Sequence, residues 1–233
     1  MEGHHMIVGT GNEELDRRLG GIPFPSLILF EGDHGTGKSV LSAQIAYGLL
    51  SIQKKGFIIT TEQTTAEYLR KMREVKINLI PFFLKGLLGI APLNTSKFNW
   101  NSKLAEKILE IATAFIKSKV KDFCIIDSLS VIATFADEMK IMEFIKELRV
   151  MVDNGKLVLI TIHPGIFNEE LTKRITSIVD VYFKLSSAII GGRRIKVLER
   201  VKTIGGIQGS DAISFDVDPS LGIKIVPLSL SRA

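Results

Sequence analysis

Residues 31–39, EGDHGTGKS, combine glycine, lysine and serine at a spacing that suits phosphate chemistry. They complete the pattern G-x-x-x-x-G-K-[ST] between the apolar run SLILF and the helical pattern VLSAQIAYGLL. Glycines let successive backbone N–H groups point at phosphate oxygens, and the following helix contributes the positive end of its dipole. In this pattern Lys38 reaches the β- and γ-phosphates and the Ser39 hydroxyl ligates Mg²⁺. The sequence therefore predicts a site for ATP and Mg²⁺ whose nucleotide-binding residues are Gly32, Asp33, His34, Gly35, Thr36, Gly37, Lys38, Ser39 and Val40.

Asp127 is the predicted metal partner of this loop. It follows the apolar run FCII, and a carboxylate at the C-terminal end of a neighbouring strand would face the metal. Taken alone, an aspartate in this position is explained equally well as the cap of a helix or turn. Together with the phosphate loop, it indicates that Ser39 and Asp127 are the Mg²⁺ ligands.

Short β-rich runs alternate with helical patterns along the first two thirds of the chain. The strands are SLILF, GFIITT, LLGIAPL, FCIID and LVLITI, and the helical patterns are VLSAQIAYGLLSIQ, TAEYLRKMREV, KLAEKILEIATAFIKSK and EMKIMEFIKELRVMV. Continuous apolar strands separated by amphipathic helices indicate a parallel sheet that is covered on both faces. In the last third, VDVYFKLSSAII, RRIKVLERVK, AISFDVD and GIKIVPL are strands joined by glycine-rich turns, which predicts antiparallel additions to one end of the sheet.

Length and composition restrict the organisation of the chain. Its 233 residues contain no Pro/Gly/Ser-rich or long charged stretch that would act as a linker, so residues 6–233 are expected to form a single ATP-binding domain. Residues 1–5, MEGHH, are interpreted as a cloning remnant, and their histidines are not counted as ligands. A single cysteine excludes a disulfide framework, and no apolar run reaches the ~20 residues of a membrane span. We therefore expect a cytoplasmic protein without a membrane span.

Several segments resemble a known family. Residues 10–39, TGNEELDRRLGGIPFPSLILFEGDHGTGKS, resemble the opening of the RecA-like ATPases related to the circadian clock protein KaiC, and FDVDPSLGIKIVPL resembles their terminal hairpin. The similarity spans residues 7–230. Within this group, GDHGTGKSVLSAQ, TTEQTT, APLNTSKFNWNS and LERVKTIGGIQGSD resemble the accessory ATP-binding proteins of the archaellum, the motility organelle of archaea.

The resemblance implies a RecA-like three-layer α/β/α domain, with a mostly parallel central sheet and antiparallel C-terminal strands. It also implies a homo-oligomeric ring, a hexamer, that lies peripherally at the cytosolic base of a membrane motor. The implied partners are the archaellum assembly ATPase, the membrane platform protein and the motor scaffold proteins.

The chain departs from the KaiC-like pattern at two places that bear on ATP hydrolysis. The resembling enzymes carry adjacent glutamates after the second strand; here the pair is Glu62 and Gln63, and an amide cannot accept a proton at neutral pH. Either this catalytic pair is impaired or Glu62 alone suffices. In the resembling enzymes a Lys-x-Arg pair on a strand reaches the neighbouring subunit, and here Glu199 and Val201 take those places. Arg200 and Lys202, one residue out of register, are the candidate trans contacts, and the shift turns them away from the phosphate unless a bulge restores their direction. Both departures predict ATP binding with slow turnover.

Three further features each have two interpretations. His163 stands where the resembling folds place a γ-phosphate sensor, although a histidine before a proline at a strand end is more often a hydrogen-bonded turn residue. Thr176 and Ser177 stand where KaiC has phosphorylation sites, although exposed hydroxyl pairs near helix ends are common. Phe98 and Trp100 lie in a polar loop, where they either anchor an interface or tuck beneath the loop and close the sheet edge.

The sequence favours a regulatory ATP-binding scaffold of the archaellum motor over two alternatives. The first alternative is an ATP-dependent DNA recombinase related to RecA and RadA, and the second is a KaiC-like autokinase. The Lys and Arg residues behind the net charge of +5 are interspersed with Asp and Glu. Neither basic loops facing a filament axis nor an N-terminal DNA-binding module is evident, so nucleic acid is not an expected partner.

Overall fold

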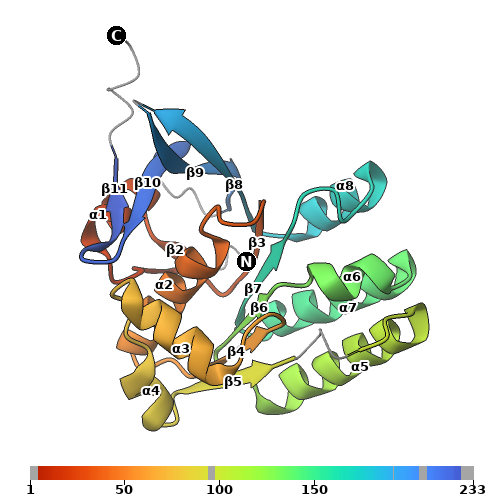
Figure 1. Cartoon of the computed structure of the whole chain (residues 1–233). Coiled ribbons are helices and arrows are strands. Elements are labelled where there is room, and N and C mark those ends of the chain that lie inside the picture. The colour runs from red at the N-terminus through yellow and green to blue at the C-terminus, as the bar shows by residue number, and fades with distance from the viewer. Residues whose placement is uncertain (1–4, 94–97, 191, 205–208, 227–233) are drawn as a thin grey trace.

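The computed structural model describes residues 5–93, 98–190, 192–204 and 209–226, which form a nine-stranded sheet with helices on both faces (Figure 1). The strands are β1 (Met6–Val8), β2 (Ile22–Phe24), β3 (Ser26–Gly32), β4 (Gly56–Thr60), β5 (Leu88–Pro92), β6 (Phe123–Asp127), β7 (Leu157–Ile162), β8 (Val181–Ile190), β9 (Arg193–Lys202), β10 (Ala212–Asp218) and β11 (Gly222–Ile225). The helices are α1 (Glu13–Leu19), α2 (Lys38–Ser51), α3 (Thr65–Glu74), α4 (Ile80–Leu84), α5 (Ser102–Lys119), α6 (Ser130–Phe135), α7 (Glu138–Asp153) and α8 (Glu169–Ile178).

The strands follow the order β11-β10-β9-β8-β3-β7-β6-β4-β5. Neighbouring strands from β8 to β5 pair in parallel, whereas β9, β10 and β11 are added antiparallel beyond β8. This arrangement confirms the predicted mostly parallel sheet with antiparallel C-terminal strands. The sequence did not predict the separate antiparallel pair of β1 and β2.

Residues of β3 alternate between the two faces of the sheet. Ile28 and Phe30 belong to the apolar cluster on the side of α1 to α4, and Leu27 and Leu29 belong to the cluster on the side of α5 to α8. All four side chains are buried. Burial on both faces explains why SLILF is a continuous apolar run, and it produces the three layers that were predicted.

The helices begin in two different ways. Thr64 and Glu67 form a capping box at α3, and Asn101 caps α5 by accepting the Leu104 N–H. In contrast, the N-cap of α2 is Gly37, which has no side chain to cover the first N–H groups of the helix. None of the helices in the described part of the chain combines the length and apolarity needed to span a membrane.

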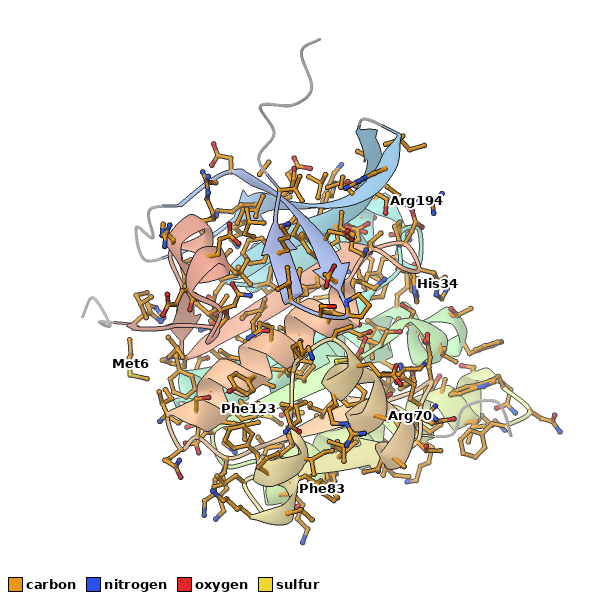
Figure 2. The ribbon with its side chains drawn as sticks, turned by 60° about the vertical axis from the view of Figure 1, so that its left-hand side comes forward. Met6, His34, Arg70, Phe83, Phe123 and Arg194 are labelled. Carbon is orange, nitrogen blue, oxygen red and sulfur yellow. The ribbon has the colours of Figure 1, made fainter. Side chains whose placement is uncertain are left out.

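The carboxyl ends of β3, β7, β6 and β4 meet at one edge of the sheet, because these strands are parallel neighbours in that order. Turns that follow them therefore converge. Figure 2 shows His34, from the turn after β3, on the outside of the molecule, whereas Phe123 at the start of β6 is fully buried. The polar residues predicted to do chemistry are thus collected at this edge.

Candidate nucleotide-binding site

The phosphate loop connects β3 to α2 and is shaped by its glycines. Gly35 and Gly37 have φ values of 76° and 97°, in the left-handed region that favours glycine. A Cβ at Gly32 would lie 2.5 Å from the carbonyl oxygen of Leu185, and one at Gly37 would lie 3.0 Å from the ring of Phe215. Larger residues are therefore excluded at both positions, and the backbone N–H groups of the loop stay accessible to an anion.

Lys38 extends from the first turn of α2 into this loop. Its ammonium donates to the carbonyl oxygens of Gly32 and Asp33, the latter at 2.9 Å, and the side chain is buried. Burial lowers the pKa of Lys38, and the negative charges of Asp127, Glu62 and Asp33 oppose that effect. The loop carbonyls thus hold the cation where phosphate oxygens would meet it.

Asp127 ends β6 beside the phosphate loop, as the sequence predicted. It is 7% exposed, and its Oδ1 accepts a hydrogen bond from Thr161 at 2.8 Å. Burial raises the pKa of Asp127, and the charge of Glu62 adds to this, while hydrogen bonds from Ser39 and Thr161 oppose the rise. The structure therefore brings the two predicted Mg²⁺ ligands, Ser39 and Asp127, to one pocket.

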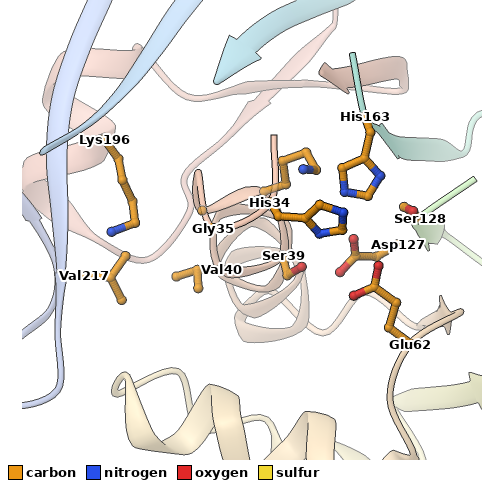
Figure 3. Close-up of a pocket in the computed structure, with 12 residues that line it drawn as sticks. His34, Gly35, Ser39, Val40, Glu62, Asp127, Ser128, His163, Lys196 and Val217 are labelled. Atoms are coloured by element: carbon orange, nitrogen blue, oxygen red, sulfur yellow. The ribbon is translucent and has the colours of Figure 1, made fainter. Parts of the chain in front are cut away.

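Glu62 and Gln63 follow β4, and the structure separates them. Glu62 lines the same pocket as Lys38 and Asp127 (Figure 3), whereas Gln63 is not among the lining residues. Within the described part of the chain, the buried Gln63 Oε1 has no hydrogen-bond partner. Of this pair, the geometry thus presents only Glu62 to the pocket.

The rings of His34 and His163 lie against each other at the pocket, with centroids 4.0 Å apart and planes inclined by 31°. The backbone N–H of His163 donates to the Ser130 hydroxyl at 2.8 Å, which is the contact expected of a turn residue. Burial and the charges of Lys38 and His34 lower the pKa of His163 to about 4. Its ring is therefore neutral near pH 7 and lines the pocket, and the role of His163 as a sensor stays a prediction.

The pocket has a volume of about 250 Å³ and includes three residues that sequence reasoning missed: Ser128, Lys196 and Val217 (Figure 3). Ser128 follows Asp127 through a cis peptide bond. Lys196 lies on β9 and Val217 on β10, and the Lys196 ammonium is 3.5 Å from Asp216. These strands are far from the loop in sequence, so only the fold of the C-terminal strands over α2 could have identified them.

The candidate trans contacts and phosphorylation sites lie outside the pocket lining. The Lys202 ammonium donates to the carbonyl oxygens of Thr176 and Ser177 at 2.9 and 3.1 Å, which caps the C-terminal end of α8. Arg200 donates to the carbonyl oxygen of Leu19 at the end of α1. The Thr176 and Ser177 hydroxyls donate to carbonyl oxygens of their own helix. Within this chain, both cations therefore bind helix ends.

The aromatic residues of the polar loop pack on one another and on α6. Trp100 stacks on Phe135 with a centroid separation of 5.6 Å, and Phe98 meets the Trp100 ring edge-on at 5.9 Å. Trp100 packs against the buried cluster beneath α5 to α8, whereas Phe98 is 41% exposed. The first part of the loop, residues 94–97, lies outside the described residues. Trp100 thus matches the tucked arrangement, and Phe98 lies at the surface.

The fold and the pocket define a KaiC-type ATPase domain of the RecA class. The ATPase family model described as KaiC matches residues 8–229. The crystal structure of the KaiC-like protein PH0186 from Pyrococcus horikoshii superposes with a TM-score of 0.73 at 20% identity, covering 96% of this chain and 100% of that one. The predicted fold class is therefore confirmed.

Archaeal relatives narrow this assignment. The chain is 66% identical to the archaeal flagellar ATP-binding protein FlaH of Sulfolobus acidocaldarius, over 98% of this chain and 100% of that protein. It is 28% identical to FlaH of Methanocaldococcus jannaschii, over 94% of each. The crystal structure of the flagellar accessory protein FlaH from that organism superposes with a TM-score of 0.81 at 25% identity, covering 93% and 96% of the two chains. The chain belongs to the FlaH family of archaeal flagellar ATP-binding proteins.

Proposed function

We propose that this chain binds Mg²⁺–ATP in the pocket after β3 and serves the archaellum motor as a nucleotide-dependent scaffold. One observation carries the proposal: Lys38, Ser39, Glu62 and Asp127, from three separate turns, line a single pocket at the carboxyl edge of the sheet. A cation, a hydroxyl and two carboxylates in this arrangement match the needs of a nucleotide and its metal ion. The names of the FlaH relatives, which describe ATP-binding proteins, support the same ligand.

The residues at the pocket fit Mg²⁺. Ser39 and Asp127 offer hard oxygen ligands, which this ion prefers, and both line the pocket. Asp127 is a buried carboxylate whose charged form is disfavoured by burial, and a bound cation would stabilise that form. Bound Mg²⁺ neutralises part of the phosphate charge, while Lys38 neutralises another part.

We expect slow hydrolysis because the pocket holds few of the groups that accelerate it. Glu62 is the candidate general base, and Gln63 does not line the pocket. Arg200 and Lys202 bind carbonyl oxygens at the ends of α1 and α8, so neither is directed at the pocket of its own chain. A cation supplied by a neighbouring subunit contributes about 10³–10⁵ in rate in related phosphoryl transfers. Its loss would leave ATP bound for long periods.

Bound ATP would then act by changing assembly. In this proposal the nucleotide favours a homo-hexameric ring, peripheral at the cytosolic base of the motor, and sets its affinity for partners. The partners are the archaellum assembly ATPase, the membrane platform protein and the motor scaffold proteins. The archaeal flagellar family supports the setting of this proposal.

The mass of the protein in solution tests the proposal, measured without nucleotide and with ADP, ATP or a non-hydrolysable ATP analogue. We expect ATP and the analogue to produce the same ring, because binding rather than hydrolysis drives assembly. Lys38→Ala should abolish both nucleotide binding and the ring, and Lys173→Ala is the matched control, since that side chain is 80% exposed on α8. A ring that forms equally in Lys38→Ala would contradict the proposal. Stimulation of hydrolysis by single-stranded DNA would favour the recombinase alternative instead.

A further inference from the structure

His34, Glu62 and His163 form a cluster whose potential ligand atoms all lie within 4.8 Å of one another. The two imidazoles lie against each other, and Figure 3 shows the Glu62 carboxylate below them, next to the carboxylate of Asp127. His34 and Glu62 are exposed and His163 is partly buried, so a solute can reach all three. Ser39 and Asp127, which the proposed function assigns to Mg²⁺, line the same pocket but are not members of this ligand group.

The fold explains why these residues meet. β3 and β7 are adjacent parallel strands, with Glu31 opposite Ile162, so the turns carrying His34 and His163 leave the sheet side by side. β4 ends at the same edge two strands beyond β7, which brings Glu62 toward them. Backbone hydrogen bonds hold two of the turns: His163 donates to Ser130, and Thr61, next to Glu62, donates to Asp127. These hydrogen bonds fix the backbone of both turns.

Two imidazoles and one carboxylate are a ligand set for a transition metal. Zn²⁺ binds histidine nitrogen at about 2.0–2.1 Å and carboxylate oxygen at about 2.0–2.2 Å, which places ligand atoms roughly 3–3.5 Å apart around a tetrahedron. Metal binding would draw together the ligand atoms, which now lie within 4.8 Å of one another, to this spacing. Mg²⁺ prefers oxygen ligands and octahedral geometry, so nitrogen ligands select against it.

We propose that His34, Glu62 and His163 bind one transition-metal dication of the Zn²⁺ class, with a fourth coordination position left open. The ion links the phosphate loop to the turns after β4 and β7. Bound Glu62 is a metal ligand and is no longer available as a base. This last consequence rests on the proposed function, whereas the site itself does not.

The chain is well suited to a test with metal alone. It contains only four histidines, and the two outside the cluster are His4 and His5. Its single cysteine, Cys124, is fully buried on β6 and does not compete for the ion. Full-length, nucleotide-free protein is titrated with Zn²⁺ against a chromophoric chelator, and Co²⁺ is added separately to record its visible d–d absorption.

We expect one Zn²⁺ per chain and the intense visible bands of four-coordinate Co²⁺, both unaffected by millimolar Mg²⁺. His34→Gln and His163→Gln should each weaken binding by more than the ~10–100-fold that loss of an outer-shell partner costs. The double variant His4→Ala/His5→Ala is the matched control and should retain the site. Circular dichroism spectra that match wild type would show that the variants are folded.

Three results would overturn the metal site: wild-type affinity in both single variants, loss of the ion from the His4/His5 control, or displacement by Mg²⁺. Lys38→Ala separates this site from the proposed function. It should lose ATP and keep the ion, because Lys38 is not a ligand. If Lys38→Ala binds ATP normally, the proposed function fails while the metal site stands.

Discussion

Thr161→Val removes a hydroxyl beside Asp127 while keeping the shape of the side chain. Thr161 is 0% exposed, and its Oγ1 donates to Asp127 Oδ1 at 2.8 Å. A hydrogen bond to a charged group contributes about 1.5–3 kcal/mol to stability. Because valine fills nearly the same volume, we expect the free energy of unfolding of the nucleotide-free protein to fall by about 1.5–3 kcal/mol at neutral pH.

This loss should depend on pH because it acts through the charge of Asp127. Burial holds the pKa of Asp127 above its usual value, so the folded protein keeps this proton to higher pH than the unfolded chain does. The stability that the carboxyl contributes therefore falls as pH rises through the interval between the two pKa values. Thr161→Val raises the pKa of Asp127 further, because the lost hydrogen bond favours the ionised form. The variant and wild type should thus differ most above the folded-state pKa and least in acid.

Urea denaturation at acidic and neutral pH measures this difference as a shift of the midpoint at constant m-value. Thr113→Val is the matched control, because it removes a hydroxyl that only bonds the Leu109 carbonyl within α5, at 2.8 Å. Thermal midpoints should fall by roughly 3–12 °C in Thr161→Val. The Kd for Mg²⁺–ATP should rise about 10–100-fold, as for loss of an outer-shell partner. A stability change below about 0.5 kcal/mol with unaltered nucleotide affinity would refute the reasoning.

Three further perturbations follow from single contacts. Asp180→Asn should lower the free energy of unfolding, measured by urea denaturation, by about 3 kcal/mol, because Asp180 is buried and pairs with Arg149 at 2.7 Å. A decrease of less than about 1 kcal/mol, which is typical of a surface pair, would contradict this. Lys202→Ala should lower the free energy of unfolding by about 0.3–1 kcal/mol, because it removes a cation from the C-terminal end of α8, and it should leave ATP affinity unchanged. A large fall in ATP turnover by the assembled ring would instead reveal a trans role for Lys202. His163→Gln should flatten the pH dependence of stability in metal-free protein. Because the pKa of His163 is lowered in the folded state, wild type loses stability as pH falls from about 6.5 toward 4. Parallel curves of unfolding free energy against pH for the two proteins would contradict this effect of burial.

Much of the central fold could be predicted because its signals are local. SLILF is continuous because β3 is buried on both faces, and the strands predicted in GFIITT, LLGIAPL, FCIID and LVLITI all form. The phosphate loop is likewise local, since strand, glycines, lysine and helix follow one another in the chain. The placement of Asp127 in the same pocket as Ser39 needed only one further step, that parallel neighbouring strands end at the same edge.

The features that were missed depend on long-range pairing. Lys196 reaches the pocket because β9 and β10 fold back over the start of α2, and no local pattern distinguishes it from other lysines of a strand. β1 and β2 are three residues each, too short to show a periodicity. The contacts of Lys202 with the end of α8 depend on two elements that are adjacent only in the folded chain. Distance in sequence, rather than composition, separates these residues from those that were predicted.

The rate at which bound ATP is converted to ADP tests most directly the central claim that this site binds ATP and hydrolyses it slowly. Protein loaded with Mg²⁺–ATP is desalted rapidly, quenched in acid at intervals and assayed for ATP and ADP. We expect roughly one ATP per chain at a phosphate loop of this type, converted far more slowly than the ~1–10³ s⁻¹ of ordinary enzymes. Lys38→Ala should retain none, while Lys173→Ala should match wild type. Equal retention by Lys38→Ala, or conversion to ADP within about a second of loading, would contradict a site that holds ATP mainly to keep it bound.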